Sequence, residues 1–271
     1  MITFNVLGPL EIVRADGTSV PIAPKVRLVL ALFLVNAGAV ASIDNIVDEL
    51  WEDRPPRSAT TTAQTYVYQL RKLLNRECCG REPLVTLAPG YILRVGDQDV
   101  LDVSTFRQLV LRARSQLDKG HPQQAAELLR QALDVWRGPP LANVACGRLL
   151  KAQVAQLKEE QSLALELRIE VDFKLGRHRR LIGELRSLVL IHPLNEWFHA
   201  RLIEALSLTG RRREALEAYR NLHSCLYHEL GILPSPEVQQ LQRDILVTGL
   251  PQNPTQNPVQ PDLPRVQATI R

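Results

Sequence analysis

The sequence has few aromatic side chains, 5% of 271 residues, and no long apolar run. A membrane-spanning helix needs about 20 consecutive apolar residues, and no stretch approaches that length. The opening residues, MITFNVLGPLEIVRADG, lack the order of basic, apolar and small residues that forms a secretory signal peptide. We therefore expect a cytoplasmic protein without a membrane partner, long enough for two modest domains that each bury a core.

Cysteine is also scarce, and none of it follows a metal or redox spacing. The four cysteines are Cys78, Cys79, Cys146 and Cys225. No CxxC pair occurs, and a disulfide between adjacent cysteines is strained, so we expect reduced, structural thiols. His223 and His228 flank Cys225, but no fourth ligand is evident, which favours ordinary helix packing over a metal site.

Signatures of catalysis are missing as well. No glycine-rich phosphate loop is present, and no Ser-His-Asp or Cys-His arrangement can be singled out. Adjacent carboxylates such as Glu159 and Glu160 project to different parts of a helix surface and cannot share a substrate. The sequence predicts no enzyme, no catalytic residues, no metal site and no cofactor.

Charge is distributed unevenly along the N-terminal part of the chain. Residues 40–53 contain five acids and no base, whereas residues 54–94 contain seven bases and two acids. A basic segment is typical of a phosphate-binding face. A solvated surface is the alternative that charge alone leaves open.

Hydrophobic patterning divides the first 57 residues into strands and helices. Apolar and polar residues alternate over the first 22 positions, which predicts short antiparallel strands. After Pro24, the run KVRLVLALFLVNAG predicts a buried helix that stops at Gly38. Ser42 then caps a short amphipathic helix, SIDNIVDELW, and the prolines in residues 53–57 indicate a stiff loop.

A third helix, capped by Ser58, is predicted over ATTTAQTYVYQLRKLLNR. Threonine and tyrosine are mediocre helix formers, so a surface requirement rather than propensity explains their number. A helical wheel places one stripe toward the core: Ala63, Val67, Leu70 and Leu74. The opposite face and its flanks carry only hydrogen-bonding side chains: Ser58, Thr61, Thr62, Thr65, Tyr66, Tyr68, Gln69, Arg71, Lys72 and Arg76.

The stretch PLVTLAPGYILRV alternates across Pro89 and Gly90 and predicts a two-stranded hairpin. Strands, three helices and a hairpin follow in the order of a winged helix-turn-helix. In that design the third helix enters the DNA major groove, and the hairpin lies beside it. Threonine and glutamine suit base edges and thymine methyl groups, whereas arginine and lysine suit phosphates or guanine.

From residue 101 onward the patterning is helical throughout. Seven amphipathic stretches cover about 102–119, 121–136, 148–174, 177–191, 194–209, 211–229 and 235–246. Gly176 and Gly210 precede similar segments 34 residues apart, which is the tetratricopeptide period. Such stacks usually bind proteins or peptides. The last residues, 248–271, are rich in proline and are predicted to be a disordered tail or linker.

Several stretches together resemble the Streptomyces antibiotic regulatory protein family of transcriptional activators, over about residues 2–246. They are FNVLGPLEI, DELWEDRPPRSATTTAQTYVYQLRKLL, APGYIL, HPLNEWFHARLIEALSLTGRRREALEAYR and ELGILPSPEVQQLQRDIL. The resemblance implies a mainly α fold with a small β part. Residues 1–96 would form an OmpR-type winged helix-turn-helix, and residues 101–247 an all-α, tetratricopeptide-like bacterial transcriptional activator domain.

The resemblance also implies activity and partners. It implies an activator of secondary-metabolite (antibiotic) biosynthesis genes that sits on the nucleoid. Such an activator binds double-stranded promoter DNA side by side as a homodimer, on tandem direct repeats near the −35 region. It recruits RNA polymerase holoenzyme through the sigma factor.

Individual positions carry over onto the predicted third helix, the hairpin at 84–94 and the loop before the helix. Ser58 to Arg76 corresponds to the recognition helix. Base contacts are expected from Thr61, Thr62, Thr65 and Gln69. Phosphate contacts are expected from Arg57, Tyr66, Arg71, Lys72, Arg76 and Arg94, with further backbone contacts from Lys25 and Arg27. The polymerase-facing loop corresponds to Trp51, Glu52, Asp53 and Arg54, and runs on to Arg57.

One alternative stays open at this point: a helical-repeat scaffold that binds a partner without reading DNA. An enzyme is a third and weaker possibility. The chain is expected to be either a small family member or a fragment that ends in a linker, and the sequence leaves the promoter and any sensed ligand undefined.

Overall fold

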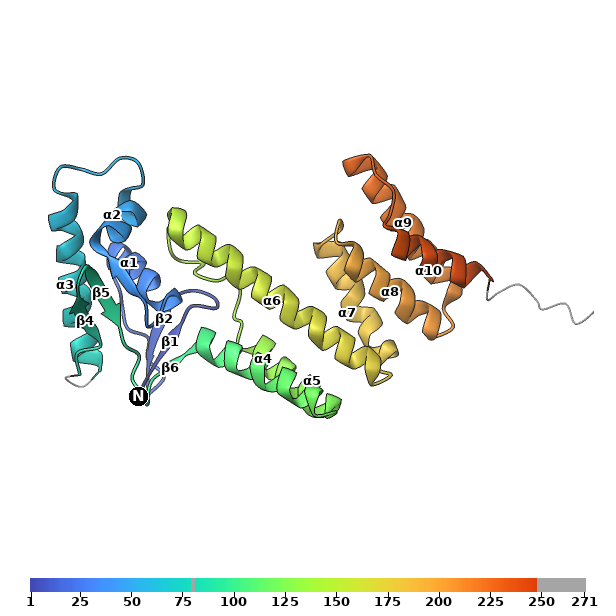
Figure 1. Ribbon diagram of the computed structural model, residues 1–271, viewed down its shortest axis with the longest axis horizontal. Helices are drawn as coiled ribbons and strands as arrows, with labels where there is room; N and C mark the ends of the chain where they lie inside the picture. The colour runs from blue at the N-terminus through green and yellow to red at the C-terminus, as the bar shows by residue number, and fades with distance from the viewer. Residues whose placement is uncertain (79–80, 248–271) are drawn as a thin grey trace, which may run out of the picture. The chain divides into compact units, whose positions relative to one another are not determined.

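The computed structural model describes residues 1–78 and 81–247 (Figure 1). The predicted tail at 248–271 and Cys79 lie outside the described residues. The chain divides into two compact units, Met1–Arg177 and His178–Arg271. The described residues form a mainly helical fold with two small three-stranded sheets, which agrees with the predicted mainly α fold with a small β part.

The first sheet joins the start of the chain to a strand about a hundred residues later. Its order is β2 (Glu11–Arg14), β1 (Ile2–Asn5), β6 (Val100–Leu101). β1 pairs with β2 in the predicted antiparallel manner, and with β6 in parallel. Ile2 and Phe4 are buried, which accounts for the alternation seen in the sequence. The two-residue β6 was not predicted, because it is too short to show a period.

Two predicted helices follow the first strands. α1 (Pro24–Val35) is buried along most of its length, and it ends three residues before Gly38, which has a left-handed φ of 83° in the following turn. β3 (Val40–Ser42) leads into α2 (Ile43–Trp51). The Ser42 hydroxyl accepts a hydrogen bond from the Asn45 amide at 3.1 Å, which confirms the predicted cap.

α3 (Ala59–Glu77) is the predicted third helix and begins after Ser58 as predicted, but its capping differs from the prediction. The Ser58 side chain makes no capping hydrogen bond. Its backbone angles, φ −92° and ψ 13°, lie outside the extended region from which a cap side chain reaches back to the first turn. The predicted side-chain cap is therefore wrong, although Ser58 is the N-cap residue and its carbonyl oxygen accepts the first hydrogen bond of the helix, from the Thr62 amide at 2.9 Å.

The predicted hairpin is present as β4 (Leu84–Leu87) and β5 (Gly90–Leu93). The second sheet has the order β3–β5–β4, and Thr86 lies opposite Tyr91 in its register. A Cβ at Gly90 would lie 2.0 Å from the Ala41 carbonyl oxygen, so β5 can approach β3 only with glycine at this position. Figure 1 shows this hairpin beside α3. We refer to residues 84–94 as the wing.

Three further helices complete the first unit. α4 (Asp102–Asp118) and α6 (Arg148–Lys174) both pack against α5 (Pro122–Asp134). Phe106 of α4 and Leu150 and Leu157 of α6 belong to the same buried cluster as Phe4 and Leu30. The interval between residues 96 and 101, where two domains were expected to meet, therefore lies inside one compact unit.

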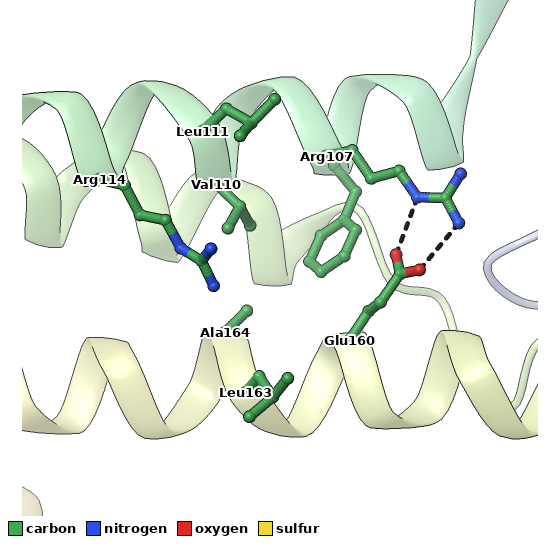
Figure 2. Close-up of a pocket in the computed structure, with 8 residues that line it drawn as sticks. Arg107, Val110, Leu111, Arg114, Glu160, Leu163 and Ala164 are labelled. Carbon is green, nitrogen blue, oxygen red and sulfur yellow. Dashed lines mark hydrogen bonds and ion pairs between the residues drawn. The ribbon is translucent and has the colours of Figure 1, made fainter.

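α4 and α6 leave a groove of about 300 Å³ between them (Figure 2). Val110 and Ala164 lie along the groove, and the exposed Leu111 and Leu163 stand on opposite sides of it. At one end the Arg107 guanidinium donates to both oxygens of Glu160, at 2.8 and 2.9 Å. This bidentate pair joins the two helices directly.

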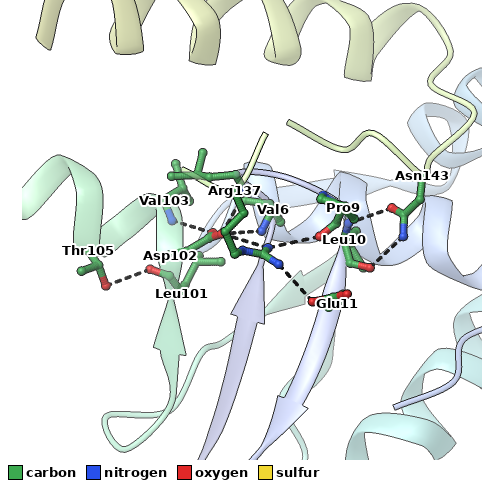
Figure 3. Close-up of polar contacts among 11 residues, drawn as sticks. Val6, Pro9, Leu10, Glu11, Leu101, Asp102, Val103, Thr105, Arg137 and Asn143 are labelled. Atoms are coloured by element: carbon green, nitrogen blue, oxygen red, sulfur yellow. Dashed lines mark hydrogen bonds and ion pairs between the residues drawn. The ribbon is translucent and has the colours of Figure 1, made fainter. Parts of the chain in front are cut away.

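A buried carboxylate joins the start of α4 to the first sheet (Figure 3). Asp102 accepts hydrogen bonds from the amides of Val6 at 2.7 Å, Leu7 at 2.8 Å and Val103 at 2.7 Å. Desolvation by burial raises the pKa of Asp102, and these hydrogen bonds partly oppose that rise. Nearby, the Asn143 side chain exchanges two hydrogen bonds with the backbone of Leu10. The residues after α5 are thereby fixed to the β1–β2 connection.

The second unit is helical where it is described, as predicted. It contains α7 (His178–Ile191), α8 (Glu196–Leu208), α9 (Arg212–Leu230) and α10 (Pro236–Val247). α8 packs against α7, α9 and α10. The Asn195 side chain caps α8, and Gly210 takes a left-handed φ of 76° in the turn before α9.

Candidate nucleic-acid interface

The inner face of α3 matches the predicted stripe. Ala63, Val67, Leu70 and Leu74 are buried, which fixes the rotation of the helix. The predicted base-reading residues lie on the outer side. Thr61, Thr65 and Gln69 are exposed, and Thr62 is half-buried. The helix therefore presents a row of hydroxyl and amide groups to solvent.

This polar face is wider than the sequence indicated. Besides Tyr68, which the sequence already placed on this face, Thr60 and Gln64 are exposed, at i and i+4 along the helix. Thr60 and Gln64 were not among the predicted site residues. On the helical wheel these two positions lie between the apolar stripe and the polar face, and the sequence prediction assigned them to neither.

Hydrogen bonds within α3 restrict what its threonines can offer a ligand. The Thr65 hydroxyl donates to the Thr61 carbonyl oxygen at 2.9 Å. Its hydroxyl hydrogen is thus used, so the oxygen is free only as an acceptor, and the methyl group is free for apolar contact. An acceptor next to a methyl group suits a cytosine or adenine amino group and a thymine methyl group.

The predicted phosphate-contacting cations differ in their surroundings. Arg57, Lys72 and Arg94 are exposed and form no ion pair with any residue in 1–78 or 81–247. Arg76 is also exposed, but it pairs with Glu77 at 2.9 Å. Unpaired surface cations lose no internal partner when they meet a phosphate.

Glu77 holds the end of α3 in place. Arg14 of β2 donates to both of its oxygens, at 2.7 and 3.1 Å. The Arg14 hydrogen bond lowers the pKa of Glu77, and Arg76 lowers it further against the opposing effect of desolvation. The far end of the helix is thus attached to the first sheet.

Arg71 is turned toward the wing. Its Nε donates to the Leu84 carbonyl oxygen at 3.2 Å, and its Nη2 donates to the Thr86 hydroxyl at 2.9 Å. The guanidinium carbon lies 5.9 Å from the centre of the Tyr91 ring. Tyr66, another predicted phosphate contact, is half-buried against the core.

The predicted polymerase-facing loop joins α2 to α3 and lies beside the start of α6. Trp51 is half-buried, whereas Glu52, Asp53 and Arg54 are exposed. Glu52 has a left-handed φ of 51°, which costs a residue other than glycine about 1–3 kcal/mol. Asp53 pairs with Arg148 at 3.2 Å, and Glu52 lies 3.6 Å from the Lys151 amine.

A buried acid beneath this loop was missed by the sequence analysis. Glu49 is 2% exposed, and its carboxylate accepts from the amides of Gly147 at 2.5 Å, Leu149 at 2.9 Å and Leu150 at 3.2 Å. The negative charge therefore sits at the N-terminus of α6. A signal was available, because Glu49 lies three residues after Ile46 on the apolar side of α2.

Lys25 and Arg27 were predicted to add contacts to the DNA backbone. The Lys25 amine donates to the Leu50 carbonyl oxygen at 3.3 Å. The Arg27 guanidinium donates to the carbonyl oxygens of Ile22 at 3.0 Å and Asn143 at 3.3 Å. Both side chains thus bond to the protein itself, and their DNA contacts stay predictions.

Within residues 1–78 and 81–247, no group of three or more His, Cys, Asp or Glu side chains is placed to hold a metal ion. The described helices include none that is long and apolar enough to span a membrane. Cys146 and Cys225 are free, half-buried thiols.

Comparisons with known families match both parts of the chain. The model described as transcriptional regulatory protein, C terminal, matches residues 17–93. The model for the bacterial transcriptional activator domain matches residues 101–246.

Individual relatives agree with these matches. Regulatory protein DnrI of Streptomyces peucetius is 40% identical over 249 residues, covering 89% of this chain and 91% of DnrI. Regulatory protein AfsR of Streptomyces coelicolor is 35% identical over 90% of this chain, which spans 24% of AfsR. The structure of Mycobacterium tuberculosis EmbR in complex with a low affinity phosphopeptide has a TM-score of 0.84 at 33% identity. That match covers 91% of this chain and 65% of the EmbR chain. The chain therefore belongs to the Streptomyces antibiotic regulatory protein family of DNA-binding transcriptional regulators with a winged helix-turn-helix.

Proposed function

We propose that this protein is a sequence-specific activator of secondary-metabolite biosynthesis genes that recruits RNA polymerase to their promoters. The observation that carries the proposal is the outer face of α3. This face is polar, rich in threonine, free of acids between residues 59 and 76, and next to the wing. Family membership and the 40% identity to a Streptomyces regulatory protein support the gene class.

Within this proposal, base reading falls to Thr61, Thr62, Thr65 and Gln69. Phosphate binding falls chiefly to the exposed cations without internal partners, Arg57, Lys72 and Arg94. Arg76 and Tyr66 are secondary candidates, because each has a contact within the protein. Phosphate contacts position the helix, and base contacts give the specificity.

One chain carries one recognition helix, which reads one half-site. Two chains bound side by side on tandem direct repeats would double the contact area and raise specificity. We propose this arrangement near the −35 region, where the exposed loop residues Glu52, Asp53 and Arg54 face the sigma factor of the polymerase. Their exposure supports this role, because the three side chains are open to a partner.

The deciding experiment is a footprint on promoter fragments combined with a salt titration of binding. A protected pair of direct repeats is the expected result. Each neutralised phosphate contributes about −0.9 to the slope of log K against log[salt], so a steep slope is expected. K72M should reduce that slope by about one unit.

K158M provides the matched control, because Lys158 is an exposed lysine on α6. It should leave the slope unchanged. Absence of protection on all fragments, or tight binding that ignores salt, would contradict the proposal. A reporter assay with D53A in full-length protein tests polymerase recruitment separately: DNA affinity should persist while activation falls.

A further inference from the structure

We propose that Arg71 is a positioning residue, which sets the wing against the recognition helix, and that a phosphate is not its partner. This inference rests on the proposed function, because it concerns how the DNA-reading surface is assembled. It reassigns a residue that the sequence placed among the phosphate contacts.

The geometry around Arg71 carries the inference. Its guanidinium bonds to both a backbone and a side-chain oxygen of β4, Leu84 O at 3.2 Å and Thr86 Oγ1 at 2.9 Å. Tyr91 of β5 lies opposite Thr86 in the hairpin, and its ring centre is 5.9 Å from the guanidinium carbon. One side chain from α3 thus contacts both strands of the wing.

The next residue along the helix shows the contrast. Lys72 is exposed and has no ion pair in the described chain, whereas Arg71 is half-buried. A phosphate ligand needs a charge that is free to face the DNA, and Lys72 meets this requirement. Arg71 donates from two nitrogens of its planar guanidinium to two acceptors at once. Lysine has a single ammonium nitrogen and cannot reproduce this geometry.

The consequence for DNA reading is geometric. The recognition helix lies in the major groove while the wing contacts the neighbouring backbone or minor groove. The separation between them therefore decides which base pairs the helix meets when the wing is seated. By joining the middle of α3 to β4, Arg71 fixes that separation before DNA arrives, and binding loses less conformational entropy.

The test uses full-length protein and the promoter fragment defined by footprinting. R71K keeps the positive charge but cannot form the paired hydrogen bonds of the guanidinium. T86V removes the hydroxyl acceptor on the wing and keeps a side chain of nearly the same shape. We expect R71K to weaken binding about tenfold, the effect of one charge-assisted hydrogen bond, and T86V to weaken it less. The double variant should bind no worse than R71K, because R71K already loses the bond to Thr86 that T86V removes.

Hydrogen exchange in the free protein provides a readout without DNA. Amides of residues 84–94 should exchange faster in R71K and T86V than in wild type, while K72M should leave them unchanged. Hydroxyl-radical footprints of R71K should lose protection at the wing side and keep it along the recognition helix. Thermal unfolding of each variant checks that the chain remains folded.

Opposite results would overturn the inference. A phosphate role predicts that R71K binds nearly as well as wild type, that T86V is neutral or additive, and that wing exchange is unchanged. Failure of wild-type protein to bind any promoter would refute the proposed function instead, and the exchange experiment would still decide whether Arg71 holds the wing.

Discussion

α2 and α3 are neighbouring helices that place their polar residues in opposite ways. On α2 the decisive polar group is Glu49, which points inward and bonds to three amides around the start of α6. On α3 the polar groups point outward, and the buried positions are apolar. The two helices therefore have different roles. α2 connects the helix-turn-helix to α6, and the outer face of α3 is left free to bind a ligand.

The connecting role would be broken most completely by truncation after residue 96. Phe106, Leu150 and Leu157 share one buried cluster with Phe4 and Leu30. A chain of residues 1–96 would expose that apolar surface, so we expect it to unfold or aggregate. Residues 1–177 should fold and show a cooperative thermal transition by circular dichroism. A stable, cooperative 1–96 fragment would show that α4–α6 are dispensable for the fold of the DNA-binding part.

Replacing Glu49 tests the same connection at one side chain. E49Q removes the charge and part of the acceptor capacity facing three buried amides, and we expect the free energy of unfolding to fall by about 2–3 kcal/mol. Urea unfolding measures this change. The control is D48N, an exposed acid on the same helix, which should change stability by less than about 0.5 kcal/mol. Equal effects of the two variants on the free energy of unfolding would show that Glu49 does not stabilise the contact between α2 and α6.

On α3 the matched variants T65S and T65V separate the two contacts that Thr65 can offer. T65S keeps the acceptor and removes the methyl group, whereas T65V keeps the methyl group and removes the acceptor. Each should relax base preference at one position by about 1–3 kcal/mol without changing the salt slope. Affinity measured across single-base variants of the site provides the readout. A uniform loss on all sequences would instead point to a structural role.

The smallest expected effect concerns the pH dependence of stability. Bonding to Arg14 lowers the pKa of Glu77, so the pair stabilises the fold above the unfolded-state pKa and this contribution is lost as the pH falls. E77Q should therefore flatten the loss of stability below about pH 4.5. Asp102 has a raised pKa, which gives the opposite sign: its contribution declines as the pH rises. Urea unfolding between pH 3 and 7 compares E77Q with wild type, and parallel curves would exclude the Glu77 effect.

Hydrophobic periodicity predicted the buried faces of helices and strands, but it did not predict caps or long-range hydrogen bonds. The core stripe of α3, the alternating hairpin and the C-terminal helices were readable because burial repeats at a fixed period. The Ser58 cap was predicted from residue type, but capping depends on backbone angles that residue type does not determine. The roles of Glu49 and Asp102 depend on amides about a hundred residues away in sequence, and no local pattern encodes such a distance.

In the candidate site, too, the sequence predicted the residue types on the helix face but not their contacts. The sequence predicted phosphate contacts from both Arg71 and Lys72, because sequence alone does not distinguish the surroundings of two adjacent basic residues. In the structure one of them bonds to the wing and the other faces solvent. Only the arrangement of β4 beside α3 separates them. The scaffold alternative required a first domain that merely packs, and membership in a family of DNA-binding regulators argues against it.

Glu49 fixes the start of a long helix, α6, against α2. α6 has 27 residues, which corresponds to about 40 Å at 1.5 Å per residue. Gly147 allows the close approach, since a Cβ there would lie 2.8 Å from the Glu49 carbonyl oxygen. A side chain at position 147 would therefore push the start of α6 away from α2.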